Sequence, residues 1–181
     1  VYIQTMNNAA ANDVTDPRAA LARETARLAN VAKGHTLGAK YRANMTGPEI
    51  AKAIRADIKA AQKAGDLPAM TVSVRSRLST HAMAIDVEIK AWSGQVWSTA
   101  RARYDVMRTG GPIPSRLSHS ASLLLDAVKS YADAYNYDRS DAMTDYSDVN
   151  FYLSVDFAPE LTDASREATE AAVRGAYGAA S

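Results

Sequence analysis

The chain has 181 residues, of which 47% are hydrophobic and 23% are charged, with a formal net charge of +1 at neutral pH. This size and composition are typical of one globular domain, and no window approaches the ~18 consecutive apolar residues of a membrane span. The lack of cysteine excludes disulfides, thiol nucleophiles and cysteine-ligated metals, and the first residues lack the pattern of a signal peptide. We therefore expect a cytoplasmic protein that does not contact a membrane.

The charges are distributed unevenly along the chain. Residues 1–119 contain 17 Lys and Arg against 9 Asp and Glu, whereas residues 120–181 contain 4 against 11. Such a split indicates either an interaction surface or two halves whose charges neutralise each other within one fold. Both halves also carry apolar faces that belong to one core, which favours the second interpretation.

The first 45 residues are expected to form an arm, a peripheral helix and a linker. Residues 1–15 have no hydrophobic period and are expected to be a mobile arm. Asp16-Pro17 fits the start of a helix, with Asp as N-cap and Pro at the first helical position, and Gly34 fits its end. We expect residues 16–45 to consist of this N-terminal helix followed by a basic linker.

An α+β domain is expected over residues 46–181. Thr46-Gly-Pro-Glu49 has the spacing of a capping box, and Ile50, Ile54 and Ile58 mark the apolar face of the helix that follows. Residues 70–77 and 83–91 alternate apolar and polar side chains, which indicates two strands of an antiparallel hairpin. On the polar face of this hairpin, two arginines are expected to pair with two acids across the strands: Arg75, Arg77, Asp86 and Glu88.

The second half of the domain is expected to add two helices and a long strand. After the breaker Gly110-Gly-Pro-Ile-Pro114, apolar residues from Ala121 to Tyr135 recur at helical spacing. Residues 149–157 alternate strictly, as in a half-buried strand. A final helix starts at Pro159, and its inward face is predicted to contain Leu161, Ala164, Ala168 and Ala171. The predicted fold class is therefore α+β, with an antiparallel sheet of three or more strands and helices packed on one face.

A loop dense in Asp, Ser and Tyr precedes the long strand. Its acids recur every three or four residues, whereas a calcium loop needs acids at alternate positions around a central glycine. Carboxylate oxygens suit Mg²⁺ or Ca²⁺, but Asp also caps turns, and capping combined with pairing to the basic half is the interpretation favoured most. We assign no metal and no other cofactor. The residues that would bind a partner are Tyr135, Tyr137, Asp138, Asp141, Asp145 and Tyr146.

No set of residues has the spacing of a catalytic site. The three histidines lie far apart, and none has a second ligand at metal-binding spacing. Neither a nucleophile elbow nor a phosphate-binding glycine loop is present. His81, in the predicted hairpin turn, is the strongest candidate for a base, with a solvated loop histidine as the simpler interpretation. We assign no catalytic residues and expect a protein that is not an enzyme.

The basic residues supply a second candidate surface. Four of them follow one face of the first core helix and two lie on the first hairpin strand: Lys52, Arg55, Lys59, Lys63, Arg75 and Arg77. Such a patch binds nucleic acid through its phosphates. A basic stripe is also the ordinary solvated face of an amphipathic helix, and no base-stacking motif accompanies it. Similarly, Trp92 and Trp97 fit an interaction patch and core packing equally well.

The segment Tyr135-Asn-Tyr-Asp-Arg-Ser-Asp-Ala-Met-Thr-Asp-Tyr146, which leads into Asn150-Phe-Tyr152, resembles the C-terminal part of a known family, the large polyvalent-protein-associated domain 29. Residues 46–92 resemble its upstream half, in which a helix, a turn and the strand Val72-Ser-Val-Arg-Ser76 precede a second strand. The chain departs from the family pattern in a long insertion at residues 93–114 and in its Ala-rich N-terminal helix. The resemblance implies a protein of phages and mobile elements, and it supplies no catalytic residues.

The function predicted first is therefore that of a phage or mobile-element accessory protein in the cytoplasm of the bacterial host. It is expected to act by binding a host macromolecule, with counter-defence as one role, and not by catalysis. The expected partner is a host protein or complex. A nucleic-acid-binding module that uses the basic helix is the alternative, and the charge asymmetry with the thin helical stripes also allows a homo-oligomer.

Overall fold

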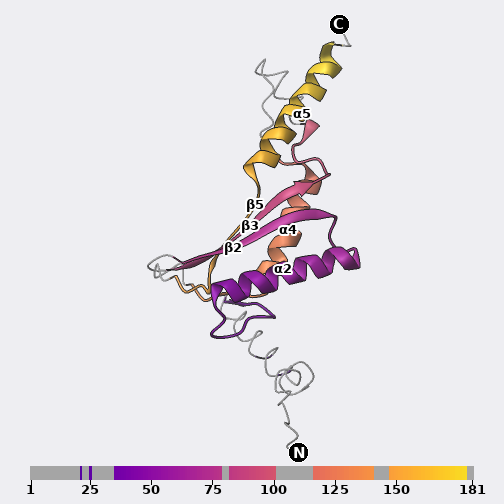
Figure 1. The fold of residues 1–181 in the computed structure, drawn as a ribbon. Coiled ribbons are helices and arrows are strands. Elements are labelled where there is room, and N and C mark those ends of the chain that lie inside the picture. Colours follow the sequence, from indigo (N-terminus) through magenta and orange to yellow (C-terminus); the bar gives the residue numbers. More distant parts are fainter. Residues whose placement is uncertain are drawn as a thin grey trace, which may run out of the picture.

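A computed structural model of the chain describes residues 21, 25, 35–78, 82–100, 116–140 and 147–178. This part of the chain has an α+β fold with three helices, a three-stranded mixed sheet and a two-stranded antiparallel sheet (Figure 1). None of its helices is both long and apolar enough to cross a bilayer. The predicted fold class is therefore confirmed at the level of α+β.

The larger sheet has the strand order β2–β3–β5, where β2 is Met70–Leu78, β3 is Met83–Trp92 and β5 is Tyr152–Phe157. Strands β2 and β3 form the predicted antiparallel hairpin, but β5 runs parallel to β3. The expectation of a fully antiparallel sheet was thus wrong. The chain passes through helix α4 between β3 and β5, and a helical crossover of this kind brings the second strand back in the direction of the first.

Helix α2, Gly47–Ala64, covers one face of this sheet. The predicted capping box is present, because the backbone N–H of Thr46 donates to the Glu49 carboxylate at 2.8 Å. At the other end, Gly65 has a φ of 88°, a left-handed conformation that glycine adopts without steric cost. The predicted apolar face is confirmed, since Ile50, Ile54 and Ile58 are fully buried.

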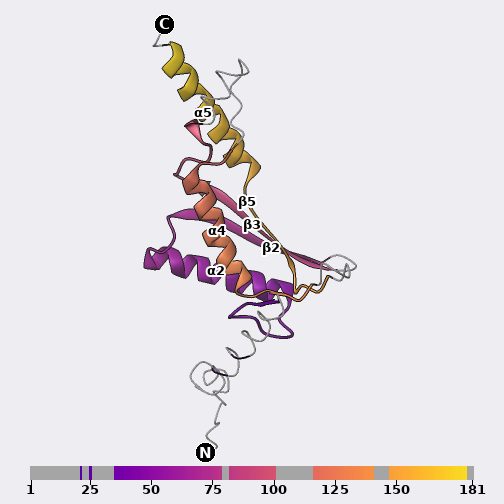
Figure 2. The same cartoon turned by 180° about the vertical axis from the view of Figure 1, so that it is seen from behind.

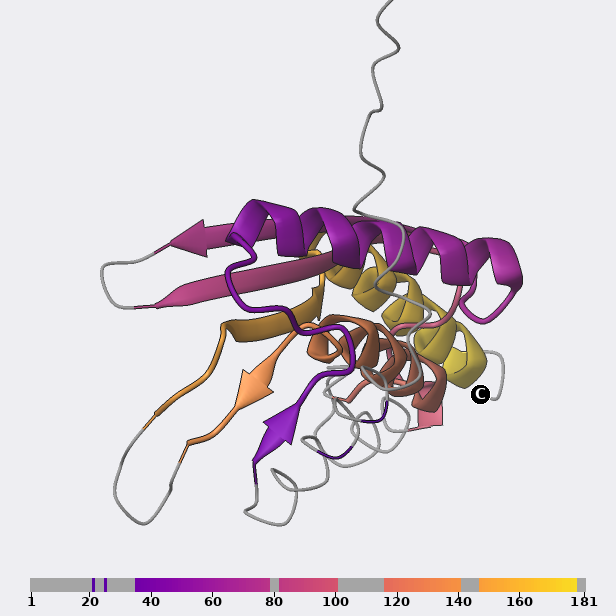
Figure 3. The ribbon, with the colours of Figure 1, turned by 90° about the horizontal axis from the view of Figure 1, so that it is seen from below.

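Helix α4, His119–Asp133, lies against the same face of the sheet, toward β5 (Figures 2 and 3). The hydroxyl of Ser118 caps it by accepting from the N–H of Ala121 at 3.0 Å. The two helices and the inward-facing side chains of the strands form one hydrophobic core, to which the sheet contributes Val74, Ile85, Val87, Ile89 and Phe157.

Helix α5, Pro159–Gly178, follows β5 and extends away from the end of the sheet (Figure 1). Its predicted inward face was wrong at three positions, because Ala164, Ala168 and Ala171 are exposed. The buried positions are instead Thr169 and Val173, which lie one turn apart. A methyl group adds little apolar area, so a larger side chain decides which face of an Ala-rich helix is buried.

A smaller sheet pairs β1, Thr36–Leu37, with β4, Tyr137–Asp138. The segment after β1 closes the end of α4, because the N–H of Lys40 donates to the Ala134 carbonyl at 2.7 Å. A Cβ atom at Gly38 would lie 2.3 Å from that same carbonyl oxygen, so the close approach requires glycine. Residues 35–45, expected to be a linker, are therefore hydrogen-bonded to the domain that follows them.

Candidate functional site

The exposed face of α2 carries four basic side chains in a row. Lys52, Arg55, Lys59 and Lys63 are all exposed and follow one another at spacings of three and four, opposite the buried isoleucines. Lys59 and Lys63 also line a shallow depression of about 700 Å³ beside Met70. The predicted stripe therefore exists as one continuous, accessible surface, which we call the α2 basic stripe.

Among the described residues, three members of the α2 basic stripe are not neutralised. Within the described residues, no acidic side chain forms an ion pair with Lys52, Lys59 or Lys63. Two acids of α2 are occupied elsewhere, Glu49 at the helix cap and Asp57 in an ion pair of 2.6 Å with Lys40. Lys63 also lies in the last turn, where the negative end of the helix dipole favours a cation. Lys52 and Lys59 have no such structural use in the part of the chain that the structure describes.

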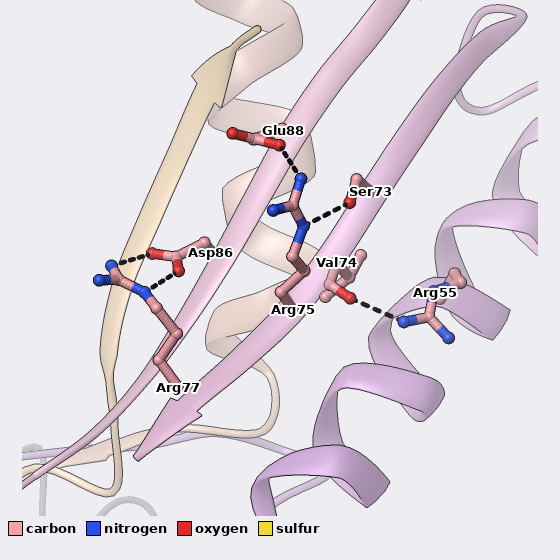
Figure 4. Close-up of polar contacts among 7 residues, drawn as sticks. All are labelled: Arg55, Ser73, Val74, Arg75, Arg77, Asp86 and Glu88. Atoms are coloured by element: carbon pink, nitrogen blue, oxygen red, sulfur yellow. Dashed lines mark hydrogen bonds and ion pairs between the residues drawn. The ribbon is translucent and has the colours of Figure 1, made fainter. Parts of the chain in front are cut away.

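Arg55 has a role in the fold. Its guanidinium donates to the carbonyl of Val74 at 2.7 Å (Figure 4). Strand β2 is an edge of the sheet, so the outward-directed carbonyls of this strand have no neighbouring strand to bond them. Gln62, two turns later on α2, donates in the same way to the Met70 carbonyl at 2.8 Å. Arg55 and Gln62 therefore bond two of the carbonyls along the β2 edge.

Arg75 and Arg77 do not join the α2 basic stripe. They project from the opposite face of the sheet, which neither α2 nor α4 covers. There Arg75 bonds Glu88 at 2.8 Å and Arg77 forms a two-pronged pair with Asp86 (Figure 4). The predicted cross-strand pairing is thus confirmed. The hydrogen bonds from Arg77 lower the pKa of Asp86 below its usual range. The six predicted basic residues are divided between two faces, and the pair on the sheet is already neutralised.

Of the acidic and aromatic loop, the structure describes Tyr135, Tyr137 and Asp138, while Asp141, Asp145 and Tyr146 lie outside the described residues. Tyr135 is buried, and its hydroxyl donates to the Asp57 carboxylate at 2.7 Å. Burial, reinforced by this carboxylate, raises the pKa of Tyr135 above its usual range. Tyr135 thus ties the end of α4 to α2.

Tyr137 and Asp138 also make local contacts. The ring of Tyr137 packs edge-to-face with Tyr41 with 5.0 Å between ring centroids, and the Arg139 guanidinium lies over the Tyr137 ring, 4.5 Å from its centroid. The carboxylate of Asp138 accepts from the N–H of Ser140 at 2.9 Å, and hydrogen bonds from Ser140 lower its pKa. The prediction that Asp caps turns in this loop is confirmed for Asp138.

The tryptophans and histidines add no convergent site among the described residues. Trp92 stacks on Phe157 with 5.7 Å between centroids, and the indole N–H of Trp97 donates to the Thr162 carbonyl at 2.9 Å, which favours the core-packing interpretation of both. His81 lies outside the described residues. Where side chains are described, no three His, Asp or Glu residues are grouped as they would be around a metal ion.

One structurally important residue was missed by the sequence analysis. The side-chain amide of Asn136 donates to the Phe151 carbonyl at 3.0 Å and accepts from the Phe151 N–H at 3.1 Å. It thereby makes both backbone bonds that a neighbouring strand would make to Phe151. Asn150 makes a related bond to the Tyr135 carbonyl at 3.1 Å. The signal available in the sequence was the presence of asparagine directly after a helix and directly before a strand.

Comparisons of the chain with family models, with curated proteins and with solved structures gave no match.

Proposed function

We propose that this protein acts by binding a macromolecule and not by catalysis, and that its binding surface is the α2 basic stripe. The proposed partner is nucleic acid, held through its phosphates. The observation that carries the proposal is the row of exposed lysines Lys52, Lys59 and Lys63, which no acid of the described residues neutralises. Exposed cations without partners are the groups that release counterions from a phosphate backbone on binding.

The shape of the surface suits this partner. Eleven helical steps separate Lys52 from Lys63, which is about 16 Å along the helix axis. About ten phosphate charges lie along the same length of duplex. Arg55 remains at the centre of the row and has further N–H donors besides those that bond Val74. The described part of the stripe has no aromatic side chain, so we expect binding without marked sequence preference.

Two observations favour the α2 basic stripe over the other candidate surfaces. The described members of the acidic and aromatic loop are used in packing and capping, as Tyr135 and Asp138 illustrate. Arg75 and Arg77 are paired with acids. The setting in which the nucleic acid would be bound, a bacterial cytoplasm entered by a phage or mobile element, rests on the resemblance of the loop and strand described above.

The test measures the affinity of the full chain for labelled duplex DNA and for labelled single-stranded RNA by fluorescence anisotropy. The triple variant Lys52→Gln, Lys59→Gln, Lys63→Gln should lose most of the affinity for both. The matched control neutralises three exposed cations elsewhere, Lys90→Gln, Arg116→Gln and Arg174→Gln, and changes the net charge equally. Equal losses in the two variants would show that total charge and not the stripe is responsible, and retained binding in the first would contradict the proposal.

A further inference from the structure

Helix α5 carries a row of acidic side chains that is the counterpart, in charge, of the α2 basic stripe. Four acids follow one another on one side of α5 at spacings of three and four residues: Glu160, Asp163, Glu167 and Glu170. The first three are exposed and the fourth is half-buried. We call this row the α5 acidic stripe.

The α5 acidic stripe is not neutralised within the described residues, where no cation forms an ion pair with any of its four members. Arg166 of the same helix lies instead over the Trp97 ring, 4.6 Å from its centroid. The uneven charge of the two halves of the sequence is therefore not cancelled at these stripes by contacts in the part of the chain that the structure describes. Each stripe has the charge that the other would bind.

The two stripes do not meet within one copy of the chain. Figures 1 and 2 show that α2 lies beside the larger sheet, whereas α5 leaves the end of the sheet and points away from α2. A second copy, in contrast, brings an α2 basic stripe and an α5 acidic stripe of its own. We propose that the α5 acidic stripe of one copy binds the α2 basic stripe of another.

The two rows match in spacing and in length. Successive members are separated by three, four and four residues in the α2 basic stripe, and by three, four and three residues in the α5 acidic stripe. At about 1.5 Å per residue, the rows are about 16 Å and about 15 Å long. Two helices laid side by side therefore set four cations opposite four acids, with each pair offset by about 1.5 Å at most.

A contact between exposed charges is weak and sensitive to salt, because solvent and ions screen each pair. The contact also joins two different surfaces, so each copy of a pair keeps one stripe that is not used. A further copy can bind there, and assembly can continue beyond a dimer. We therefore expect self-association that appears at high protein concentration and low salt.

The contact occupies the same lysines that nucleic acid occupies in the proposed function. Nucleic acid and the α5 acidic stripe of another copy should therefore compete for the α2 basic stripe. Only this competition rests on the proposed function, whereas self-association follows from the two stripes alone. Short duplex DNA that binds the α2 basic stripe should dissociate the assembly.

The first test is the average mass of the full chain by sedimentation equilibrium. At about 0.01 M salt, where the screening length is about 30 Å, the mass should rise above the 19.4 kDa of one chain as the protein concentration increases. At about 0.1 M salt, where the screening length is about 10 Å, the dissociation constant of the assembly should be roughly tenfold or more higher. A chain that stays monomeric at the lower salt concentration, up to millimolar protein, would overturn the proposal.

Two neutralised variants test which surfaces meet. The basic-stripe variant is Lys52→Gln, Lys59→Gln, Lys63→Gln, and the acidic-stripe variant is Asp163→Asn, Glu167→Gln, Glu170→Gln. Neither should self-associate, because each has lost one of the two stripes. Their equimolar mixture should form a one-to-one complex and nothing larger, since only one intact stripe of each kind remains. The matched control neutralises three exposed acids elsewhere and should assemble as the wild type does: Asp66→Asn, Asp126→Asn and Asp156→Asn.

The outcomes separate this inference from the proposed function. An acidic-stripe variant that assembles like the wild type, or a mixture of the two variants that stays monomeric, would overturn the inference and leave nucleic-acid binding untouched. A wild type that assembles through the two stripes but binds neither duplex DNA nor single-stranded RNA would support the inference and contradict the proposed function.

Discussion

The hydroxyl of Tyr135 donates a hydrogen bond of 2.7 Å to the carboxylate of Asp57, 78 positions earlier in the chain. Lys40 reaches the same carboxylate oxygen at 2.6 Å. One acid therefore joins three segments, namely the segment after β1, helix α2 and the end of α4. Asp57 lies on α2 between Arg55 and Lys59, and Tyr135 directly precedes Asn136. The tie therefore connects the α2 basic stripe with the residue that bonds Phe151.

Replacing Tyr135 by Phe should lower the free energy of unfolding by about 1–2 kcal/mol near neutral pH, because a part-buried bond to a charged acceptor is lost. The folded state raises the pKa of Tyr135, so the contribution of the tie is complete below the ordinary tyrosine pKa of about 10 and falls as the pH rises above it. Urea unfolding of both proteins at about pH 8 and about pH 11 measures this. A difference between the two proteins that grew at high pH would contradict the assignment.

Arg55→Ala should destabilise the fold, whereas Lys59→Ala should not. Removal of Arg55 leaves the edge carbonyl of Val74 without its charged donor, at a cost of about 1–3 kcal/mol. Lys59 has no partner in the described part of the chain, and its replacement should change the free energy of unfolding by less than about 0.5 kcal/mol. Both variants remove one positive charge from the same helix face. Equal stability of the two variants in denaturant titrations would mean that the bond from Arg55 to the Val74 carbonyl does not stabilise the fold.

Asn136→Asp should destabilise the fold although the two side chains have nearly the same size. Aspartate still accepts from the N–H of Phe151, but it cannot donate to the Phe151 carbonyl and places a negative charge beside it. Asn136→Ala loses both bonds, and each unsatisfied backbone group costs about 1–3 kcal/mol where water cannot replace the lost bond. Melting temperatures should fall in both variants. If Phe151 exchanged its amide hydrogen no faster in Asn136→Ala than in the wild type, the two bonds between Asn136 and Phe151 would not stabilise this part of the fold.

The pairs of Arg75 and Arg77 on the open sheet face should contribute little to stability. Arg75 and Arg77 are largely exposed, and solvent and salt screen exposed ion pairs strongly. The pKa of Asp86 is lowered by Arg77, so the small contribution of that pair is present above the ordinary aspartate pKa of about 4 and is lost as the pH falls below it. Arg77→Gln should therefore match the wild type in acid and be slightly less stable at neutral pH. A large loss of stability in Arg77→Gln at neutral pH would require a structural role for Arg77 beyond this pair.

The sequence was informative where a pattern is local. The capping box at Thr46, the isoleucine face of α2 and the alternation of β2 and β3 each depend on neighbours a few positions away, and all were predicted. The pairing of Arg75 and Arg77 followed from the same alternation. Local patterns of this kind determine which residues face the core and which face outward.

Relationships between distant segments could not be predicted in this way. An alternating strand has the same period in either direction, so the parallel pairing of β5 with β3 left no trace in residues 149–157. The separation of Arg75 and Arg77 from the α2 basic stripe depends on which face of the sheet α2 covers. In α5, the preference of Val173 over three alanines for the buried side is decided by packing between elements and not by spacing alone.

The most direct test of the central claim is the salt dependence of nucleic-acid binding. Three lysine–phosphate contacts should contribute a slope of about −3 to the logarithm of the binding constant against the logarithm of salt concentration. The variant Lys52→Gln, Lys59→Gln, Lys63→Gln should have a slope smaller by about that amount, and each single replacement should reduce it by about one. The variant with Lys90, Arg116 and Arg174 neutralised should keep the wild-type slope. If the slope of the stripe variant equalled that of the wild type, the α2 basic stripe would not be the binding surface.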